Sequence, residues 1–394
     1  MNKLTIDQVD LAGKRVFIRV DFNVPMTENG TIREETRITA AIPTIRRALE
    51  KGGRIILASH FGRPEGKVMP EYSLRPVAER LAQLLGQPVA LAPDCVGPEV
   101  ENLVNALQPG EVLLLENVRF HAGETKNSPQ LADAFARLAD VVVNDAFGAA
   151  HRAHASNVGI AQRVTPAVAG LLMADEINYF NRAVRQPQRP VAAILGGSKV
   201  STKIAVIERL LAQVDQILIG GAMAFTFFKA RGQAVGASLV EEEMLQVARN
   251  AEEQAKARGV QLLLPVDAVI AQSPNASETQ TVAIDAIPDG WMGLDIGPAT
   301  VKLFQEALQS AQTIVWNGPM GVFEKAAFAR GTLALAECVA NCQALSVAGG
   351  GDTDAALRQA GVADRISFIS TGGGAFMELL EGKELPGISV LNDA

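Results

Sequence analysis

Two lysines in a short stretch rich in glycine and hydroxyl groups are the first residues whose spacing suggests chemistry. Lys199 and Lys203 lie in GGSKVSTK, residues 196–203, directly after the apolar run PVAAIL. Glycine, lysine and hydroxyl in this order are typical of a phosphate-binding loop, but the spacing does not fit the G-x-x-x-x-G-K-[ST] pattern. If a helix begins at about Ser198, the two ammonium groups share one helix face and repel each other. An anion bound between them would remove that cost.

A second set of polar residues follows the expected strands of the first half of the chain. Arg37 opens a helical segment, where its charge opposes the positive end of the helix dipole, and this placement indicates a bound anion nearby. The other members of the set are Asp21, Asn23, His60, Arg63, Arg119 and Arg152. One exposed arginine is usually a solvated or salt-bridged surface group. Four arginines in four separate loops on one rim instead predict a receptor for phosphate or carboxylate oxygens.

Glycine-rich junctions follow the expected strands of the second half. They are GGSKVSTK, GGAMAFTF (220–227), NGPMGVFE (317–324), GGGDTDAAL (349–357) and STGGGAFMELL (370–380). Gly372, Gly373 and Gly374 stand at the start of a helix, where exposed N–H groups and the dipole favour an anion. Asp352 also precedes a helix. It either ligates Mg²⁺ together with substrate phosphates or caps the helix, and the residues alone leave both readings open.

Alternating strands and helices must position these residues. Short aliphatic runs separated by segments of helical period predict parallel βαβ units throughout. The expected strands are 15–20, 54–59, 88–91, 111–116 and 140–145 in the first half, and 191–195, 216–220, 260–265, 313–317, 344–349 and 366–370 in the second. One of the expected helices is 37–53, which ends at a double glycine.

The chain is long enough for two domains. A helical stretch at 170–190, closed by Pro187 and Pro190, predicts the boundary between them. We therefore expect an α/β fold of two Rossmann-like three-layer domains, each with a parallel sheet flanked by helices, joined by a hinge helix. The expected divisions are 1–172, a hinge at 173–188 and a second domain at 189–381.

Composition narrows the possible partners. The 394 residues are 48% hydrophobic and 20% charged, which is globular composition, and the net charge of −7 argues against nucleic acid or an anionic membrane as a partner. The charged N-terminus lacks the apolar segment of a secretory signal, so we expect a cytoplasmic protein. Three cysteines without a C-x-x-C pair indicate neither a disulfide framework nor a zinc site. The four histidines all lie in the first half, and we expect His151 and His154 to have packing or hydrogen-bonding roles.

These motifs together are similar to those of the phosphoglycerate kinase family. The resemblance rests on RVDFNVP, HFGRP, LENVRF, AHRAH, GGSKVSTK, GGAMAFTF, WMGLDIGPAT, WNGPMGVFE, GGGDT and STGGG, and it runs from about residue 5 to 390. It implies a two-lobed, monomeric glycolytic kinase that transfers a phosphoryl group reversibly from 1,3-bisphosphoglycerate to MgADP, giving 3-phosphoglycerate and MgATP. It also implies that the tail, 382–394, packs back on the N-terminal lobe.

The resemblance assigns roles to residues at matching positions. The acid substrate would be bound by Asp21, Phe22, Asn23, Arg37, His60, Phe61, Gly62, Arg63, Arg119 and Arg152. The nucleotide would be bound by Lys203, Gly220, Gly221, Asn317, Glu324, Gly350, Gly351, Asp352 and Thr353, with Asp352 as the Mg²⁺ ligand. The catalytic set would be Arg37, Lys199, Lys203, Gly372 and Gly373, with Lys199 nearer the transferred phosphoryl group. Ala222 stands where the family often has a third glycine, so the expected adenine pocket differs slightly at this position.

The chemistry implied by the resemblance needs no general base. Both exchanging oxygens are already anionic, so positioning and electrostatic stabilisation carry the rate. Direct in-line transfer between the lobes then requires closure about the hinge, which excludes water.

Two alternative functions remain open: another ATP-dependent kinase of a small acid, and a two-lobed solute-binding protein. The second leaves the glycine-rich rim unexplained.

Overall fold

The aliphatic runs of the first half of the chain form a single parallel sheet. A computed structural model describes residues 1–394 and divides them into two compact units, unit 1 (Met1–Asn178 with Glu384–Ala394) and unit 2 (Tyr179–Lys383). The sheet of unit 1 has the strand order β3-β4-β2-β1-β5-β6 and every pair is parallel. Its strands are β1 (Arg15–Arg19), β2 (Arg54–Ala58), β3 (Val89–Leu91), β4 (Val112–Leu114), β5 (Val141–Asn144) and β6 (Ala167–Ala169).

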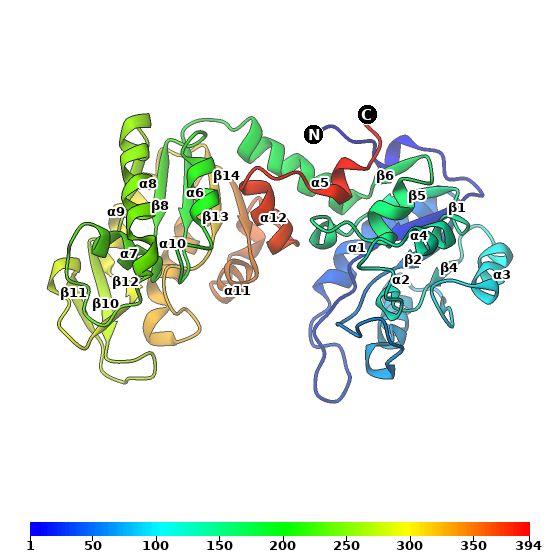
Figure 1. The fold of residues 1–394 in the computed structure, drawn as a ribbon, viewed down its shortest axis with the longest axis horizontal. Helices are drawn as coiled ribbons and strands as arrows, with labels where there is room; N and C mark the ends of the chain where they lie inside the picture. The colour runs from blue at the N-terminus through cyan, green and yellow to red at the C-terminus, as the bar shows by residue number, and fades with distance from the viewer. The chain divides into compact units, whose positions relative to one another are not determined.

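Helices cover this sheet, as Figure 1 shows on the right. They are α1 (Thr36–Glu50), α2 (Arg75–Leu85), α3 (Pro98–Ala106), α4 (Pro129–Ala136), α5 (Leu171–Phe180) and the short α13 (Pro386–Ser389). In α1, buried Ile38, Ala41, Ile45 and Ala48 recur every three or four residues, so one face of the helix packs in the core. The helix ends just before Gly52, whose φ of +74° suits a residue without a side chain.

Both ends of the chain lie in unit 1. The backbone N–H of Leu4 donates to the carbonyl of Asn392 (2.9 Å), and the N–H of Asn392 donates to the carbonyl of Ala167 (2.9 Å). Lys3 forms an ion pair with Asp393 (2.7 Å), and Figure 1 shows the two termini side by side. These contacts tie residues that lie almost 390 positions apart in the sequence to the same sheet edge.

Unit 2 repeats the parallel plan and adds a second sheet. Its six parallel strands run in the order β15-β14-β13-β7-β8-β9. They are β7 (Val191–Leu195), β8 (Gln216–Ile219), β9 (Gln261–Leu263), β13 (Thr313–Asn317), β14 (Leu345–Gly349) and β15 (Phe368–Ile369). The helices are α6 (Ile204–Leu210), α7 (Met223–Ala230), α8 (Leu245–Arg258), α9 (Pro298–Leu308), α10 (Arg330–Asn341), α11 (Gly351–Gln359) and α12 (Gly373–Leu380). No helix in either unit is long and apolar enough to cross a membrane.

The second sheet of unit 2 was not predicted from the sequence. It contains β10 (Asp267–Ala271), β11 (Gln280–Ala283) and β12 (Met292–Ile296), paired antiparallel in the order β11-β10-β12. Figure 1 shows it at one end of unit 2. In unit 1, β6 was missed as well. The expected fold of two helix-flanked parallel sheets is confirmed, and the antiparallel sheet is an addition to it.

A continuous helical segment joins the two units. It begins as α5 and continues through a π-helical turn, Asn181–Arg185. At its first end, the N–H of Met173 donates to Asp145 Oδ1 (3.2 Å) in unit 1. At its other end, the ring of Tyr179 stacks on that of Phe368 in unit 2, with centroids 4.4 Å apart and planes 10° apart. Each end is therefore fixed to its own unit.

Candidate active site

The loops that follow β1, β2 and β4 are tied together by hydrogen bonds at the carboxyl edge of the unit 1 sheet. The backbone N–H of Gly62 donates to Asn23 Oδ1 (2.9 Å), and Arg119 Nη1 donates to the carbonyl of Gly62 (2.7 Å). Gly62 has φ +58°, and a Cβ there would lie 2.3 Å from the Tyr72 ring, so only glycine fits this junction. Three of the predicted substrate-binding residues thus form one connected structure.

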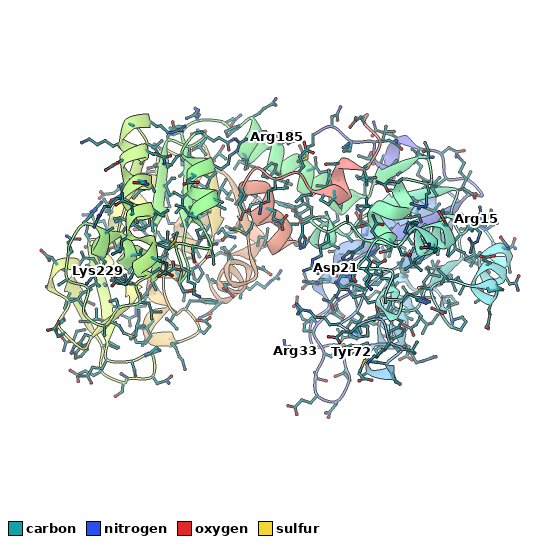
Figure 2. The ribbon with its side chains drawn as sticks, in the orientation of Figure 1. Arg15, Asp21, Arg33, Tyr72, Arg185 and Lys229 are labelled. Atoms are coloured by element: carbon teal, nitrogen blue, oxygen red, sulfur yellow. The ribbon has the colours of Figure 1, made fainter.

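Arg37 lies in the first turn of α1 and is held on one side only. Its Nη1 donates to both carboxylate oxygens of Asp21 (3.2 Å each) and to the carbonyl of Asn23 (3.0 Å). Asp21 belongs to the loop after β1 (Figure 2). The Arg37 side chain remains 41% exposed, so its other guanidinium donors are available to a ligand.

Three predicted arginines converge on a cavity of about 430 Å³ in unit 1. Arg63, Arg119 and Arg152 line it, together with Lys126 and His121. Burial lowers the pKa of Arg119 to about 10, and the positive charges of Arg19 and Arg152 add to that shift. The Nε of Arg119 is buried and has no hydrogen-bond partner. Crowded cations around an unused donor are what a site for a multiply charged anion requires.

Arg19, whose charge acts on Arg119, was not predicted from the sequence. It is completely buried at the end of β1, where its Nε donates to Ser156 Oγ (2.7 Å) and its Nη2 lies 3.1 Å from His60 Nδ1. Burial lowers the pKa of Arg19, and the carboxylates of Glu124 and Asp21 oppose the shift. A charged residue within an otherwise apolar buried strand was the available signal, because such residues are retained only with partners.

His60 is neutral in this environment. Burial, followed by the charges of Arg19 and Arg119, holds the pKa of His60 well below its usual value. Because the Arg19 guanidinium can only donate, Nδ1 of His60 accepts and Nε2 carries the proton. His60 can therefore donate one hydrogen bond to a ligand without adding charge.

Several other predicted residues of the first half have mainly structural contacts. The side chains of Phe22 and Phe61 are buried in the core of unit 1, which leaves only their backbone atoms for ligand contacts. Buried His154 has its Nδ1 3.6 Å from Glu124 Oε1, and its burial is in keeping with the packing role that was one of the two expected for it. His151 Nε2 accepts a hydrogen bond from Arg152 Nε (3.0 Å).

In unit 2, glycines allow the strand-end loops to stack on one another. Gly221 has φ +70°, and a Cβ there would lie 2.5 Å from the carbonyl oxygen of Gly197. Gly318 has φ +94°, and its Cβ would lie 2.2 Å from the carbonyl oxygen of Gly196. Hydrogen bonds join the same loops, including Met223 N–H to the carbonyl of Gly197 (3.0 Å). These close backbone contacts account for much of the glycine content of the rim.

Lys199 and Lys203 do not project from a helix, so that expectation is wrong. The segment after β7 forms turns up to Lys203, and α6 begins only at Ile204. Lys199 is exposed, whereas Lys203 is half-buried, donates to Asn317 Oδ1 and lies 3.7 Å from Met377 Sδ. Burial lowers the pKa of Lys203 to about 8, although the Asp352 carboxylate opposes the shift.

Asn317 and Thr353 hold neighbouring loops in place. Asn317 Nδ2 donates to the carbonyl of Gly349 (2.6 Å), so this side chain joins Lys203 to the end of β14. Thr353 Oγ1 donates to the same carbonyl (2.9 Å) and accepts from the N–H of Gly318 (2.8 Å). Both side chains therefore orient the loops around Lys203.

The N-termini of α11 and α12 meet beside Lys203. Gly350 is the residue preceding α11, and a Cβ on Gly373, the first residue of α12, would lie 3.3 Å from Gly350 Cα. The predicted glycines Gly351 and Gly372 flank this approach. Two converging helix N-termini offer unpaired N–H groups and positive dipole ends to one anion.

An apolar cavity of about 360 Å³ lies next to these helix termini. Its walls include Leu239, Met292, Leu294 and Val322, and its polar groups include the carboxylates of Glu324 and Asp352. Gly221 also lines the cavity, and Gly220 lies against Met320 just behind it. An apolar chamber with a polar end is suited to a ligand with a flat apolar group and a charged tail.

Known proteins of similar sequence and structure match the chain over both units. The profile of the family described as phosphoglycerate kinase matches residues 6–383. Phosphoglycerate kinase of Thermosynechococcus vestitus is 57% identical over 401 residues and covers 100% of both chains, and that of Geobacter sp. (strain M21) is 56% identical over 390 residues and covers 98% of both. The structure of phosphoglycerate kinase from Coxiella burnetii has a TM-score of 0.91 at 44% identity, covering 98% of both chains. The chain belongs to the phosphoglycerate kinase family.

Proposed function

We propose that unit 1 binds 3-phosphoglycerate or 1,3-bisphosphoglycerate and that unit 2 binds ADP or ATP, so that the family's reversible phosphoryl transfer takes place between ligands held by different units. The observation that carries the assignment is the buried, unpartnered Nε of Arg119 in the cavity lined by Arg63 and Arg152. A phosphate group would supply the missing acceptor and neutralise the crowded charge. In unit 2, the apolar cavity with Lys203 and two helix N-termini at its end fits a nucleotide.

The proposed roles divide according to charge and exposure. Neutral His60 donates a hydrogen bond to the acid substrate, and Asp21 and Asn23 fix the guanidinium of Arg37. Arg37 and exposed Lys199 stabilise the phosphoryl group as it transfers, since the remaining donors of Arg37 and the ammonium of Lys199 are available to the developing charge. Lys203 stays at the nucleotide phosphates, because its buried ammonium is already fixed by Asn317.

Magnesium fits the proposed nucleotide site through Asp352. This residue lies in the first turn of α11 and lines the cavity of unit 2. A single carboxylate combined with substrate phosphates is the usual way in which proteins hold Mg²⁺. The ion would neutralise phosphate charge during transfer. Glu324, exposed at the same cavity, is the proposed partner of the ribose hydroxyls.

Direct transfer requires the acid and the nucleotide to approach each other. We propose that this happens by closure about the helical segment 171–185, each end of which is fixed to its own unit. Closure would exclude water from the reacting groups, which need no general base. We also propose a monomeric, cytoplasmic enzyme, in keeping with the family resemblance.

Nucleotide affinity should fall as the pH rises through about 8. The ammonium of Lys203, with its pKa near that value, attracts phosphates only when protonated. The protonated fraction falls about tenfold between pH 7 and pH 9, so we expect the Kd for ADP to rise about tenfold. Isothermal calorimetry at both pH values measures this change, and Lys203→Arg, which stays charged, is the control for titration of the ligand. An equal pH effect in both proteins would show that Lys203 is not the titrating group.

Separate binding measurements test the division between the units. Arg63→Ala should weaken binding of 3-phosphoglycerate at least about tenfold, the effect of one charge-assisted hydrogen bond, and leave the Kd for ADP unchanged. Lys203→Met should weaken binding of ADP and leave the Kd for 3-phosphoglycerate unchanged. Calorimetry with each ligand alone gives all four constants. Loss of ADP binding in Arg63→Ala, or of acid binding in Lys203→Met, would overturn the assignment of sites.

A further inference from the structure

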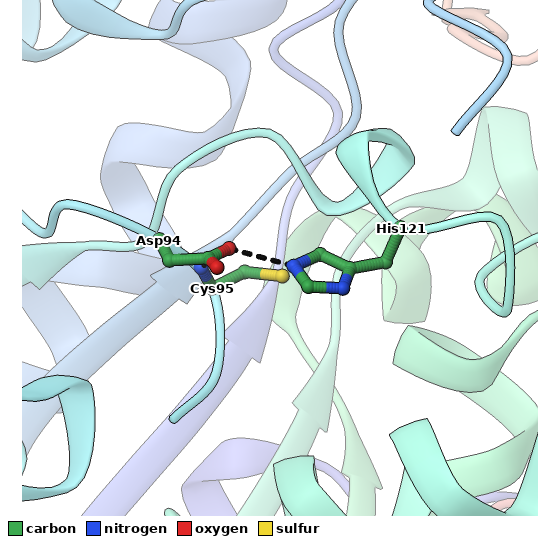
Figure 3. Close-up of side chains that lie close together, drawn as sticks. All are labelled: Asp94, Cys95 and His121. Atoms are coloured by element: carbon green, nitrogen blue, oxygen red, sulfur yellow. Dashed lines mark hydrogen bonds and ion pairs between the residues drawn. The ribbon is translucent and has the colours of Figure 1, made fainter. Parts of the chain in front are cut away.

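Three side chains of metal-ligating type meet in unit 1, and none has a role in the proposed transfer, although His121 also lines the arginine cavity. Asp94 and Cys95 follow β3, and His121 follows the short 3-10 helix Val118–Phe120 beyond β4. The pairing of β3 with β4 brings the two segments together, and the N–H of Glu116 donates to the carbonyl of Asp94 (3.3 Å). Figure 3 shows the carboxylate, the thiol and the imidazole facing one another.

The ligand atoms of this cluster nearly match the geometry of a tetrahedral metal site. Asp94 Oδ1 lies 2.7 Å from His121 Nε2, and these two atoms and Cys95 Sγ all lie within 4.8 Å of one another. Around a tetrahedral zinc ion, with bonds of about 2.0 Å to nitrogen and oxygen and about 2.3 Å to sulfur, ligand atoms are roughly 3.3–3.6 Å apart. Binding therefore needs the Asp94–His121 pair to move apart by about 0.6 Å and the pairs with Cys95 to close by no more than about 1.5 Å.

Burial leaves one side of the cluster open. Cys95 is fully buried, whereas the side chains of Asp94 and His121 are 44% and 33% exposed. A metal ion can therefore enter from the solvent side, and a water molecule can complete the coordination there. Burial raises the pKa of the Cys95 thiol well above its usual value, and the Asp94 carboxylate adds to the shift. Without an ion the sulfur is a protonated thiol; a dication would reverse this preference.

We propose that Asp94 Oδ1, Cys95 Sγ and His121 Nε2 form a binding site for a divalent transition-metal ion of the zinc class, with solvent in the fourth position. On binding, the Cys95 S–H bond breaks and its proton leaves to solvent. His121 gives up any proton on Nε2, and its nitrogen lone pair forms the bond to the metal. One thiolate and one imidazole select against Mg²⁺, which requires oxygen ligands. The site is therefore separate from the magnesium of the nucleotide.

Cobalt(II) is the probe that tests the site, because a cobalt–thiolate bond gives a charge-transfer absorption in the near ultraviolet. The test protein is the full chain carrying Cys338→Ser and Cys342→Ser, which leaves Cys95 as the only thiol. In the presence of excess Mg²⁺ we expect one equivalent of Co²⁺ to produce the band and one equivalent of Zn²⁺ to abolish it. Absence of the band in this protein would overturn the proposal.

Single substitutions in the same background identify the ligands. Cys95→Ser should remove the band, and His121→Asn and Asp94→Asn should each weaken Co²⁺ binding at least about tenfold. The two partly exposed residues can be replaced even if the buried serine prevents folding. Glu99→Gln, an exposed carboxylate nearby on α3, is the matched control and should change nothing. A band that persists in Cys95→Ser, or unchanged affinity in both His121→Asn and Asp94→Asn, would contradict the site.

Discussion

Replacing Arg37 with alanine is expected to lower kcat by about a thousandfold, with a much smaller effect on the Kd for 3-phosphoglycerate. An arginine that stabilises a transferring phosphoryl group contributes about 10³-fold or more to the rate. Arg37 is suited to this role because Asp21 and Asn23 hold one of its nitrogens while the rest of the guanidinium remains available. In the proposed assignment the acid is bound mainly by the arginines that line the unit 1 cavity, so its affinity should survive.

Steady-state rates with calorimetric Kd values on the same preparations measure the two effects of Arg37→Ala. Arg37→Lys keeps the charge but not the planar fork and should recover only part of the rate. Arg46→Ala, on the exposed side of the same helix, should leave kcat unchanged and controls for damage to α1. Equal losses in kcat and in acid affinity would mean that Arg37 only binds the substrate.

Replacing Asp352 with alanine should raise the Mg²⁺ concentration needed for half-maximal activity by at least about tenfold. The carboxylate lines the cavity of unit 2 beside the helix termini, and loss of a ligand leaves the ion held by phosphates and water alone. Magnesium titrations at fixed total ATP measure this requirement. Saturating Mg²⁺ should restore part of the activity.

Asp354 provides the matched control for this titration. It lies two residues further along α11 and pairs with Arg358 across one helical turn (2.9 Å), so Asp354→Ala removes a carboxylate from the same helix without touching the cavity. Its Mg²⁺ requirement should equal that of the unsubstituted protein. If Asp352→Ala also leaves the requirement unchanged, Asp352 serves as a helix residue rather than as a metal ligand.

The parallel sheets could be predicted from the sequence because most of their strands are buried on both faces. Such strands read as continuous aliphatic runs, as in VVVN of β5 and TIVWN of β13. The antiparallel sheet was missed because β11 is mostly exposed and polar, and β12 contains a glycine. β6, which precedes the helical linker, is only three residues long and two of them are alanine, a residue depleted in strands.

The part of the candidate site that could be predicted consists of charged side chains in the loops that follow the strands. Arg63, Arg119 and Arg152 do line one cavity. The start of α6 was misplaced because backbone turns, which residue types specify weakly, extend through Lys203. Arg19 was not predicted because its role depends on its contacts with His60 and Ser156. These contacts form only in the tertiary structure.

The cluster of Asp94, Cys95 and His121 could not be predicted from the sequence either. Its ligands come from segments 26 residues apart, and no C-x-x-C or paired-histidine spacing marks them. Only the pairing of β3 with β4 brings them together. Ligand sets assembled across neighbouring strands are therefore visible in the fold and not in the spacing.

The initial rate of acyl-phosphate formation from MgATP and 3-phosphoglycerate, with hydroxylamine as the trap, shows whether the enzyme recognises its acid substrate by the phosphate group. Glycerate, which lacks the phosphate, is the comparison substrate. We expect rapid turnover of 3-phosphoglycerate and a kcat/KM for glycerate that is lower by at least about a hundredfold, because the arginine cavity would have no phosphate to bind. No turnover of 3-phosphoglycerate, or equal turnover of the two acids, would contradict this expectation.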